Sequence, residues 1–324
     1  MSKHSALAVS VGIDVCKAWL DVHVVPEGIE FRVANTKKGH REIARRLAPL
    51  KPVIVVVEAT AKLHRGVHAY LAAHGFAVAV VNPERARLHA LSINLIAKTD
   101  KVDAKGLALY GAMARLHATP VHTQSFERLK EIVRAREAAM LDRTALINQL
   151  SQSEDRLVRK TIESRIAGCE KAIKQLDAVA LEAVKEDPAL ARRHEIICSI
   201  KGCGDVTALS LIVNLPELGT LTAKAAAMLA GLAPVANDSG DRKGRRHIDG
   251  GRLRVRTGVY MAAHSAILHN PDIRRFHDRL MEHGKLAKVA IAAAMRKLIL
   301  LANTLVREDR LWTPERPNFT AKTA

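Results

Sequence analysis

Residues 7–15 read LAVSVGIDV, and this short stretch decides the fold of the first part of the chain. It is a run of apolar and β-branched residues, which predicts a buried strand. Residues 52–58, PVIVVVE, form a second run of the same kind. Each run carries one carboxylate near its end, Asp14 in the first and Glu58 in the second. The sequence therefore predicts two buried strands that each bring an acidic side chain to the strand end.

Further strands and helices are predicted around these two runs. Residues 19–25 alternate after a short turn, so we expect an antiparallel neighbour of the first strand. Thr60 is expected to cap a helix that Gly75 closes. The other predicted strands are 29–33 and 76–81, and the predicted helices are 37–47, 62–73, one opening at Pro83, and 100–114. This order predicts an α/β layer fold with a mixed sheet.

The middle of the chain has the pattern of long helices. Residues 127–186 contain one glycine, Gly168, and no proline, and their apolar residues recur at spacings of three and four. This pattern predicts a long helical pair or a coiled coil. A solvated helical linker is the alternative. Residues 195–307 predict a second, mostly helical domain, and an irregular tail follows. The predicted domains are 1–122, 123–190, 191–308 and a tail at 309–324.

The charge of the chain points to a polyanionic partner. Its 324 residues include 51 Lys and Arg against 33 Asp and Glu, a net charge of +18. The excess is +8 over residues 1–120, zero over 121–190 and +10 over 191–324. Nucleic acid is the expected partner, and with so few aromatic residues we expect contacts to phosphates and grooves rather than base stacking. The neutral middle suits contact between protein chains.

The cellular location of the protein is predicted from the absence of membrane-spanning and secretory segments in its sequence. No apolar run reaches the roughly 18 residues of a membrane helix, and no secretory segment opens the chain. We therefore expect a cytoplasmic protein with no membrane partner. The four cysteines form no CxxC pair, so neither a disulfide framework nor a zinc knuckle is predicted.

Four carboxylates form the first candidate site. Asp100 and Asp103 are three residues apart and share one face of the helix that they open. Together with Asp14 and Glu58 they offer the hard oxygen ligands that magnesium prefers, and divalent cations would offset the cost of burying acidic strand ends. Each carboxylate also has a structural alternative. Asp100 could be the N-cap with Thr99 beside it, Asp103 a partner of the helix dipole, and Glu58 a partner of an arginine.

The second candidate site lies in the helical C-terminal part. Gly202 and Gly204 precede a predicted helix over 205–214 and resemble a helix-hairpin-helix turn, whose backbone can approach a phosphate. A plain helix–helix turn is the alternative. Residues 240–256 carry seven basic and two acidic residues, typical of a polyanion-binding loop. The predicted nucleic-acid-binding residues are Lys201, Gly202, Gly204, Arg242, Lys243, Arg245, Arg246, Arg252, Arg254 and Arg256. From composition alone, Ser239 is a turn serine.

These motifs together resemble a known family. Residues 12–17 (GIDVCK), 57–60 (VEAT) and 98–104 (KTDKVDA) are similar to the acidic motifs of the RuvC-like DEDD transposases of the insertion-sequence family numbered one hundred and ten. Residues 229–234 (LAGLAP) and the following Ser-Gly, Lys-Gly and Gly-Gly-Arg are similar to the C-terminal domain of the same family. The resemblance covers nearly the whole chain.

The resemblance implies a fold and a set of roles. The fold is an α/β RNase-H-like (RuvC-like) N-terminal domain with a mixed sheet, a helical coiled-coil middle and a mostly α C-terminal domain. Asp14, Glu58, Asp100 and Asp103 match the catalytic metal ligands, with magnesium as the ion, and Ser239 matches the proposed nucleophile. The implied partners are donor and target DNA, a guide (bridge) RNA and a second or further copy of the chain, as a homodimer or homotetramer. A bacterial cytoplasmic location, at the nucleoid when DNA is bound, agrees with these partners.

The function expected from this resemblance is that of a DNA transposase or recombinase of an insertion sequence. It would cut and rejoin DNA strands through a phosphoserine at Ser239. Two alternatives remain open at the level of sequence. One is a magnesium-dependent nuclease that resolves Holliday junctions with water as the nucleophile, and the other is a non-catalytic nucleic-acid-binding scaffold.

Overall fold

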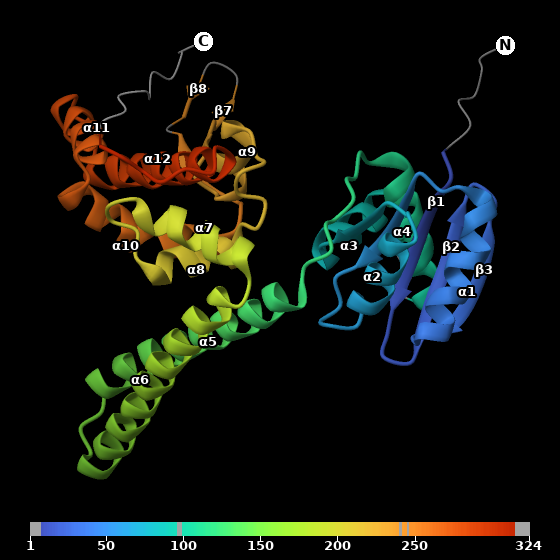
Figure 1. The fold of residues 1–324 in the computed structure, drawn as a ribbon, viewed down its shortest axis with the longest axis horizontal. Helices are drawn as coiled ribbons and strands as arrows, with labels where there is room; N and C mark the ends of the chain where they lie inside the picture. Colours follow the sequence, from blue (N-terminus) through green and yellow to red (C-terminus); the bar gives the residue numbers. More distant parts are fainter. Residues whose placement is uncertain (1–7, 96–98, 240–241, 245, 315–324) are drawn as a thin grey trace. The chain divides into compact units, whose positions relative to one another are not determined.

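A computed structural model of the protein describes residues 8–95, 99–239, 242–244 and 246–314. The chain divides into two compact units, residues 1–122 and 123–324, which are described in turn (Figure 1). The first unit is a five-stranded sheet covered by helices, and the second unit is predominantly helical.

The first unit contains a mixed sheet, as predicted. Its strands lie in the order β3-β2-β1-β4-β5. Strands β1, β2 and β3 are antiparallel neighbours, whereas β4 runs parallel to both β1 and β5. The strands are β1 (Ser10–Val15), β2 (Trp19–Val25), β3 (Ile29–Ala34), β4 (Ile54–Glu58) and β5 (Val78–Val81).

Two groups of helices cover the two faces of this sheet. One face carries alternate residues such as Val11 and Ile13, and these pack in one core with α1 and α2. The opposite face carries Val56 and Gly12, against which α4 packs. The helices are α1 (Lys37–Leu47), the short 3-10 helix η1 (Ala48–Leu50), α2 (Arg65–Ala73), α3 (Pro83–Ser92) and α4 (Asp100–Met113).

The start of α2 differs from the prediction. Thr60 is not its cap, because the helix begins at Arg65 and the preceding residue, His64, makes no capping hydrogen bond through its side chain. The chain first turns back on itself after β4, where Ala61 has a φ of 43° and the Leu63 amide donates to the Thr60 carbonyl. A left-handed residue at this point delays the helix by about one turn.

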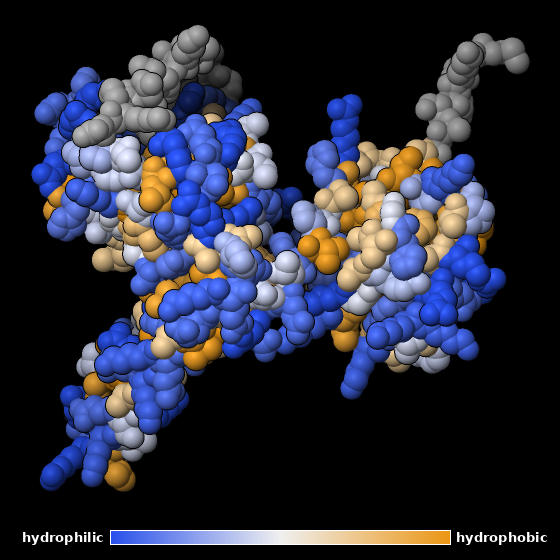
Figure 2. All heavy atoms as spheres, viewed as in Figure 1, coloured by the Kyte–Doolittle hydropathy of each residue, from blue (hydrophilic) through white to orange (hydrophobic). Residues whose placement is uncertain are grey.

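The second unit begins with an antiparallel pair of long helices, α5 (Gln124–Ser151) and α6 (Arg156–Lys185). Ion pairs cross between them along their length, with Arg128 to Glu186 near one end and Arg143 to Glu170 farther along. The predicted helical pair is thus present. Figure 2 shows mostly hydrophilic residues on the visible face of this pair, with single apolar residues among them.

Six further helices complete the helical part of this unit in the described residues. Residues Phe126 and Val184, near the open end of the α5–α6 pair, pack in the same core as these helices, so the pair and the C-terminal helices share one hydrophobic core. The elements are α7 (Pro188–Ser199), α8 (Asp205–Asn214), α9 (Ala223–Leu229), α10 (Leu253–His269), α11 (Pro271–Glu282) and α12 (Ala287–Arg307), with four short strands between α9 and α10.

Helix α12 is long and apolar enough to cross a membrane by length and composition, which the sequence analysis did not anticipate. Arg296 and Lys297 interrupt its apolar run in the sequence. In the structure, Ala294, Leu298 and Leu305 lie in the common core of the second unit. The apolar character of this helix is therefore accounted for by packing inside the protein.

Candidate active site

The two strand-end carboxylates are positioned by the parallel pairing of β1 and β4. Gly12 lies opposite Val56 in the register of this pair. Two residues further along each strand, Asp14 and Glu58 come to the carboxyl ends of adjacent parallel strands. Since side chains alternate along a strand, both project from the face that Gly12 and Val56 occupy.

Gly12 brings α4 onto this face. A Cβ atom at this position would lie 2.0 Å from the Ala104 carbonyl oxygen and 2.4 Å from the Ala108 amide nitrogen. Only glycine allows such a close approach of helix backbone to strand. The first turn of α4, which carries Asp100 and Asp103, is thereby fixed beside the end of β1. The sequence did not reveal this packing role of Gly12, because the motif of residues 12–17 was interpreted only through Asp14.

The electrostatics of Asp14 indicate that the carboxylates lie near one another. Burial, which is the largest cause, and the negative charges of Glu58, Asp103 and Asp100 together raise the pKa of Asp14 to about 6, against a lowering by a hydrogen bond from the Val15 backbone. The other three predicted carboxylates thus raise the pKa of Asp14, which lies at the carboxyl end of β1. A cluster of mutually repelling oxygen ligands fits a hard divalent cation, which would relieve the repulsion.

The start of α4 separates the alternatives considered for Asp100. Thr99 is the N-cap, with its hydroxyl accepting from the Val102 amide at 3.4 Å, and Asp100 is the first helical residue. The alternative that Asp100 caps the helix is therefore wrong. The Asp100 side chain does not cap the helix, because the Thr99 hydroxyl already accepts the hydrogen bond from the Val102 amide.

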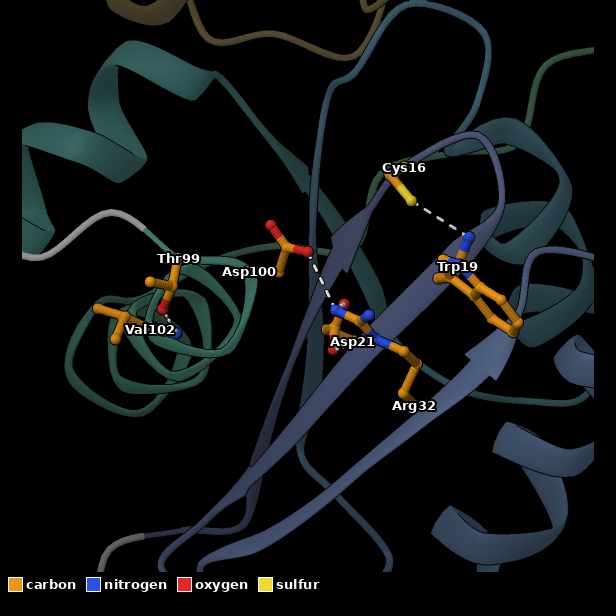
Figure 3. Close-up of polar contacts among 7 residues, drawn as sticks. All are labelled: Cys16, Trp19, Asp21, Arg32, Thr99, Asp100 and Val102. Carbon is orange, nitrogen blue, oxygen red and sulfur yellow. Dashed lines mark hydrogen bonds and ion pairs between the residues drawn. The ribbon is translucent and has the colours of Figure 1, made fainter.

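Asp100 instead forms an ion pair that the sequence analysis missed. Figure 3 shows Arg32 of β3 between Asp100 and Asp21 of β2. The Arg32 guanidinium donates to both carboxylate oxygens of Asp21, at 2.9 and 2.8 Å, and to Asp100 at 3.0 Å. Asp21 is buried and lies directly opposite Asp14 in the β1–β2 register. A fifth carboxylate with its own arginine therefore adjoins the four that were predicted.

The four predicted carboxylates are close, but they do not form a complete coordination sphere. No three of them have ligand atoms within 4.8 Å of one another. Arg32 holds Asp100 toward Asp21, and a cavity of about 370 Å³, lined in part by Asp21, Arg32 and Lys101, opens on this side. A cation bound by all four carboxylates would require Asp100 to exchange its arginine for the metal.

The turn between α7 and α8 has the predicted glycines. Gly204 is the N-cap residue of α8, and an added Cβ there would meet no atom within 4 Å. Gly202 has a φ of 102°, and an added Cβ would lie 2.5 Å from the backbone of Ala266 in α10. Gly202 is therefore required by packing inside the unit, whereas Gly204 faces open space. The Lys201 ammonium lies 5.9 Å from the centre of the Trp312 ring.

Ser239 lies in one of two short antiparallel strand pairs between α9 and α10. Strand β6 (Pro234–Val235) pairs with β9 (His247–Ile248), and β7 (Asp238–Ser239) pairs with β8 (Arg242–Lys243), so that Ser239 is opposite Arg242. The backbone of both residues is described, and their side chains, like that of Lys243, lie outside the described atoms, as does all of Arg245. The described part of the predicted basic loop thus contains two short antiparallel strand pairs, one of which includes Ser239.

The arginines at the start of α10 bind groups of the protein itself. Arg252 donates to both oxygens of Glu217, at 2.7 and 2.6 Å, and to the Asn214 carbonyl. Arg254 pairs with Glu137 of α5, and Arg256 donates to the carbonyls of Gly250 and Gly231. Arg246, in contrast, is exposed between β8 and β9. These contacts give Arg252 and Arg254 a structural role. A count of basic residues in the sequence does not reveal such a role.

Comparisons with known proteins match two separate segments of the chain. A family model described as "Transposase", for the DEDD type, matches residues 11–156, which include the four carboxylates. A second model, "Transposase IS116/IS110/IS902 family", matches residues 194–278, which include Ser239. The two matched segments therefore contain both candidate sites.

Similar proteins are found over the full length as well. Pilin gene-inverting proteins of Moraxella bovis and Moraxella lacunata are each 25% identical over 312 residues, 93% of this chain and 96% of theirs. The 44.8 kDa protein of insertion element IS116 from Streptomyces clavuligerus is 30% identical over 155 residues, which is 47% of this chain and 38% of that protein.

Proposed function

Because the chain belongs to the IS116/IS110/IS902 family of transposases, and is an enzyme that acts on DNA, we propose that it moves or inverts a DNA segment by covalent strand exchange at Ser239. The observation that carries this proposal is the gathering of Glu58, Asp100 and Asp103 around Asp14, whose pKa all three raise. The printed name of the Moraxella relatives describes the inversion of a gene, and insertion and inversion both require strands to be cut and rejoined.

In the proposed reaction the Ser239 hydroxyl attacks a DNA phosphorus. A bond forms between serine Oγ and phosphorus, the bond from phosphorus to one deoxyribose oxygen breaks, the hydroxyl proton is lost and the leaving oxygen gains a proton. A deoxyribose hydroxyl of the second strand then attacks the same phosphorus and releases the serine. One ester bond replaces another at each step, so no ATP is needed.

The carboxylate cluster would hold a divalent cation, for which we propose magnesium. Asp14, Glu58, Asp100 and Asp103 would be its ligands, and the bound ion would stabilise negative charge on the phosphoryl oxygens. The protein's own contribution is to keep this cluster at the end of β1, through the approach of α4 to Gly12. Arg32 offsets part of the negative charge in the absence of the cation.

We further propose that the target is selected by a guide RNA and that the active form is a homodimer or homotetramer. The positive charge outside the neutral middle, +8 and +10, supports binding of several nucleic acid strands. Base pairing would then supply sequence specificity, and the protein would contact backbone and shape.

The experiment that tests the serine is a Ser239→Ala substitution in the full chain, assayed on element-end and target DNA with magnesium and the guide RNA. We expect loss of both the covalent protein–DNA adduct and strand exchange. Ser151→Ala is the matched control, because Ser151 is an exposed serine at the end of α5 and should leave both activities intact. Full strand exchange by Ser239→Ala would overturn the serine mechanism and favour a nuclease that uses water. Full function of Asp14→Asn and Glu58→Gln would instead favour a scaffold.

A further inference from the structure

A second group of metal-ligand side chains lies far along the sequence from the carboxylate cluster, at the turn between α7 and α8. His194 and Cys198 are four residues apart on α7 and therefore share one helix face. Asp205 is the first residue of α8, on the other side of the turn. Among the described residues, these three form the one group of at least three such side chains whose ligand atoms all lie within 4.8 Å.

The separations of the three ligand atoms match those around a tetrahedral zinc ion. His194 Nε2 lies 3.1 Å from Asp205 Oδ1, and Cys198 Sγ lies 3.6 Å from each of these two atoms. Ordinary zinc bond lengths at tetrahedral angles give separations of roughly 3.4 Å from nitrogen to oxygen and roughly 3.6 Å from sulfur to nitrogen or oxygen. Only small side-chain shifts would be needed for the three atoms to bind one ion.

The chemistry of the three donors also suits zinc. Thiolate, imidazole and carboxylate are its usual ligands, and one thiolate with one carboxylate would neutralise its two positive charges. His194 and Cys198 are partly buried, which limits competition from water, while 56% of the Asp205 side chain is exposed. Solvent can thus supply the fourth ligand. This arrangement is unlike the oxygen-only cluster of the first unit, which favours magnesium.

We propose that His194, Cys198 and Asp205 bind one zinc ion, which joins the end of α7 to the start of α8 and so fixes the turn that contains Lys201, Gly202 and Gly204. Several contacts already hold this turn, among them the approach of Gly202 to Ala266 in α10, the hydrogen bond from the Cys203 amide to the Ile200 carbonyl, and the hydrogen bond from the Asn270 side chain to the Lys201 carbonyl. The metal would add a further anchor between the two helices. On binding, the Cys198 thiol loses its proton to solvent, and a bond from sulfur to zinc replaces the bond to hydrogen.

The test uses the full chain, stripped of metal with a chelator and titrated with Zn²⁺ against a chromophoric competitor. We expect one zinc ion per chain at this site and a higher unfolding temperature with zinc. Co²⁺ should give the charge-transfer absorption of a thiolate ligand. Cys198→Ser and Asp205→Asn should each weaken zinc binding by at least about tenfold, since outer-shell partners of a metal already account for a factor of that size.

Two other cysteines serve as matched controls. Cys16 follows Asp14 by two residues in the sequence, and Cys169 lies on α6. The variants Cys16→Ser and Cys169→Ser should both keep the Co²⁺ absorption and the zinc affinity of the unaltered chain. The same affinity in Cys198→Ser as in the unaltered chain, or no thiolate absorption with Co²⁺, would overturn the proposal. In that case His194, Cys198 and Asp205 form only a hydrogen-bonded group. Asp205→Asn is exposed and near-isosteric, so its result does not depend on the tolerance of the core to Cys198→Ser.

Discussion

Asp14 is the proposed metal ligand at which the binding of a proton and of a cation would be most directly linked. Its pKa of about 6 exceeds the ordinary value of 3.8, so the folded chain holds a proton at Asp14 more tightly than the unfolded chain does. The stability contributed by this protonation is fully present below pH 3.8 and is lost as the pH rises through about 6. A cation bound at Asp14 must displace that proton when the pH is below 6.

The apparent affinity for magnesium should therefore depend on pH. Below about pH 6 we expect it to fall by roughly tenfold per pH unit, and above that value it should level off. Calorimetric titration of the full chain with Mg²⁺ on both sides of pH 6 measures this dependence. In Asp14→Asn any remaining affinity should lose the dependence in this range. A constant affinity in the unaltered chain across pH 6 would contradict the assignment of Asp14 as a ligand.

Single residues also show what sequence reasoning can find at this scale. The four carboxylates were identified because each stands at a recognisable place, a strand end or the first turn of a helix. Arg32 and Asp21 were missed because neither belongs to a motif, and their link to Asp100 depends on the pairing of three strands. His194, Cys198 and Asp205 were missed for a similar reason, since the cysteines were considered only as CxxC pairs.

At the scale of elements, the packing of α4 on β1 is the contact that builds the carboxylate cluster. Gly12→Ala would place a methyl group against the backbone of Ala104 and Ala108, so α4 must move. We expect a loss of about 3 kcal/mol in the free energy of unfolding, together with weaker magnesium binding. Chemical denaturation and calorimetry measure the two effects.

Gly168→Ala is the opposite case and serves as the control for that substitution. Gly168 lies within α6, and an added Cβ would meet no atom within 4 Å. The substitution should stabilise the chain by about 0.5–1 kcal/mol through helix propensity alone. Equal effects of the two substitutions would contradict the close packing of α4 on β1.

The elements themselves were predictable to different degrees. The strands of the first unit and the helices α1, α3 and α4 follow from apolar runs, proline and capping residues. The strand pair that carries Ser239 did not, because its strands are two residues long and their pairing is set by the backbone rather than by apolar alternation. Helix α2 begins later than predicted because Thr60 lies in a turn.

At the scale of the whole molecule, the two candidate sites belong to different compact units. The carboxylates lie in residues 1–122 and Ser239 in residues 123–324. One reaction that uses both sites needs the two units to meet, within one chain or between two. The neutral α5–α6 pair, with exposed Leu141, Leu157 and Val179, favours assembly of two chains.

Mixing two inactive variants tests this assembly. Asp14→Asn lacks a carboxylate and keeps Ser239, whereas Ser239→Ala lacks the serine and keeps the carboxylates. If the site combines residues from two copies, a mixture should recover a measurable part of strand exchange, about a quarter to a half for random pairing in a dimer. A mixture as inactive as either variant alone would show that both sites act within one chain.

Distribution of charge was the feature of the whole chain that sequence described best, with its positive ends and neutral middle. What it could not reveal is that several of the counted arginines, such as Arg252 and Arg254, are neutralised by carboxylates of the same unit. Such pairs form only after folding, so the free positive surface is smaller than the formal charge.

A covalent bond between Ser239 and DNA can be observed directly. The protein–DNA adduct is trapped in the presence of magnesium, both components are digested, and the modified peptide is identified by mass spectrometry. Trypsin should release Ser239 within residues 225–242, between Lys224 and Lys243. We expect a nucleotide attached to this peptide at Ser239 and no adduct with Asp14→Asn. Attachment at another residue, or strand cleavage with no adduct, would rule out Ser239 as the nucleophile.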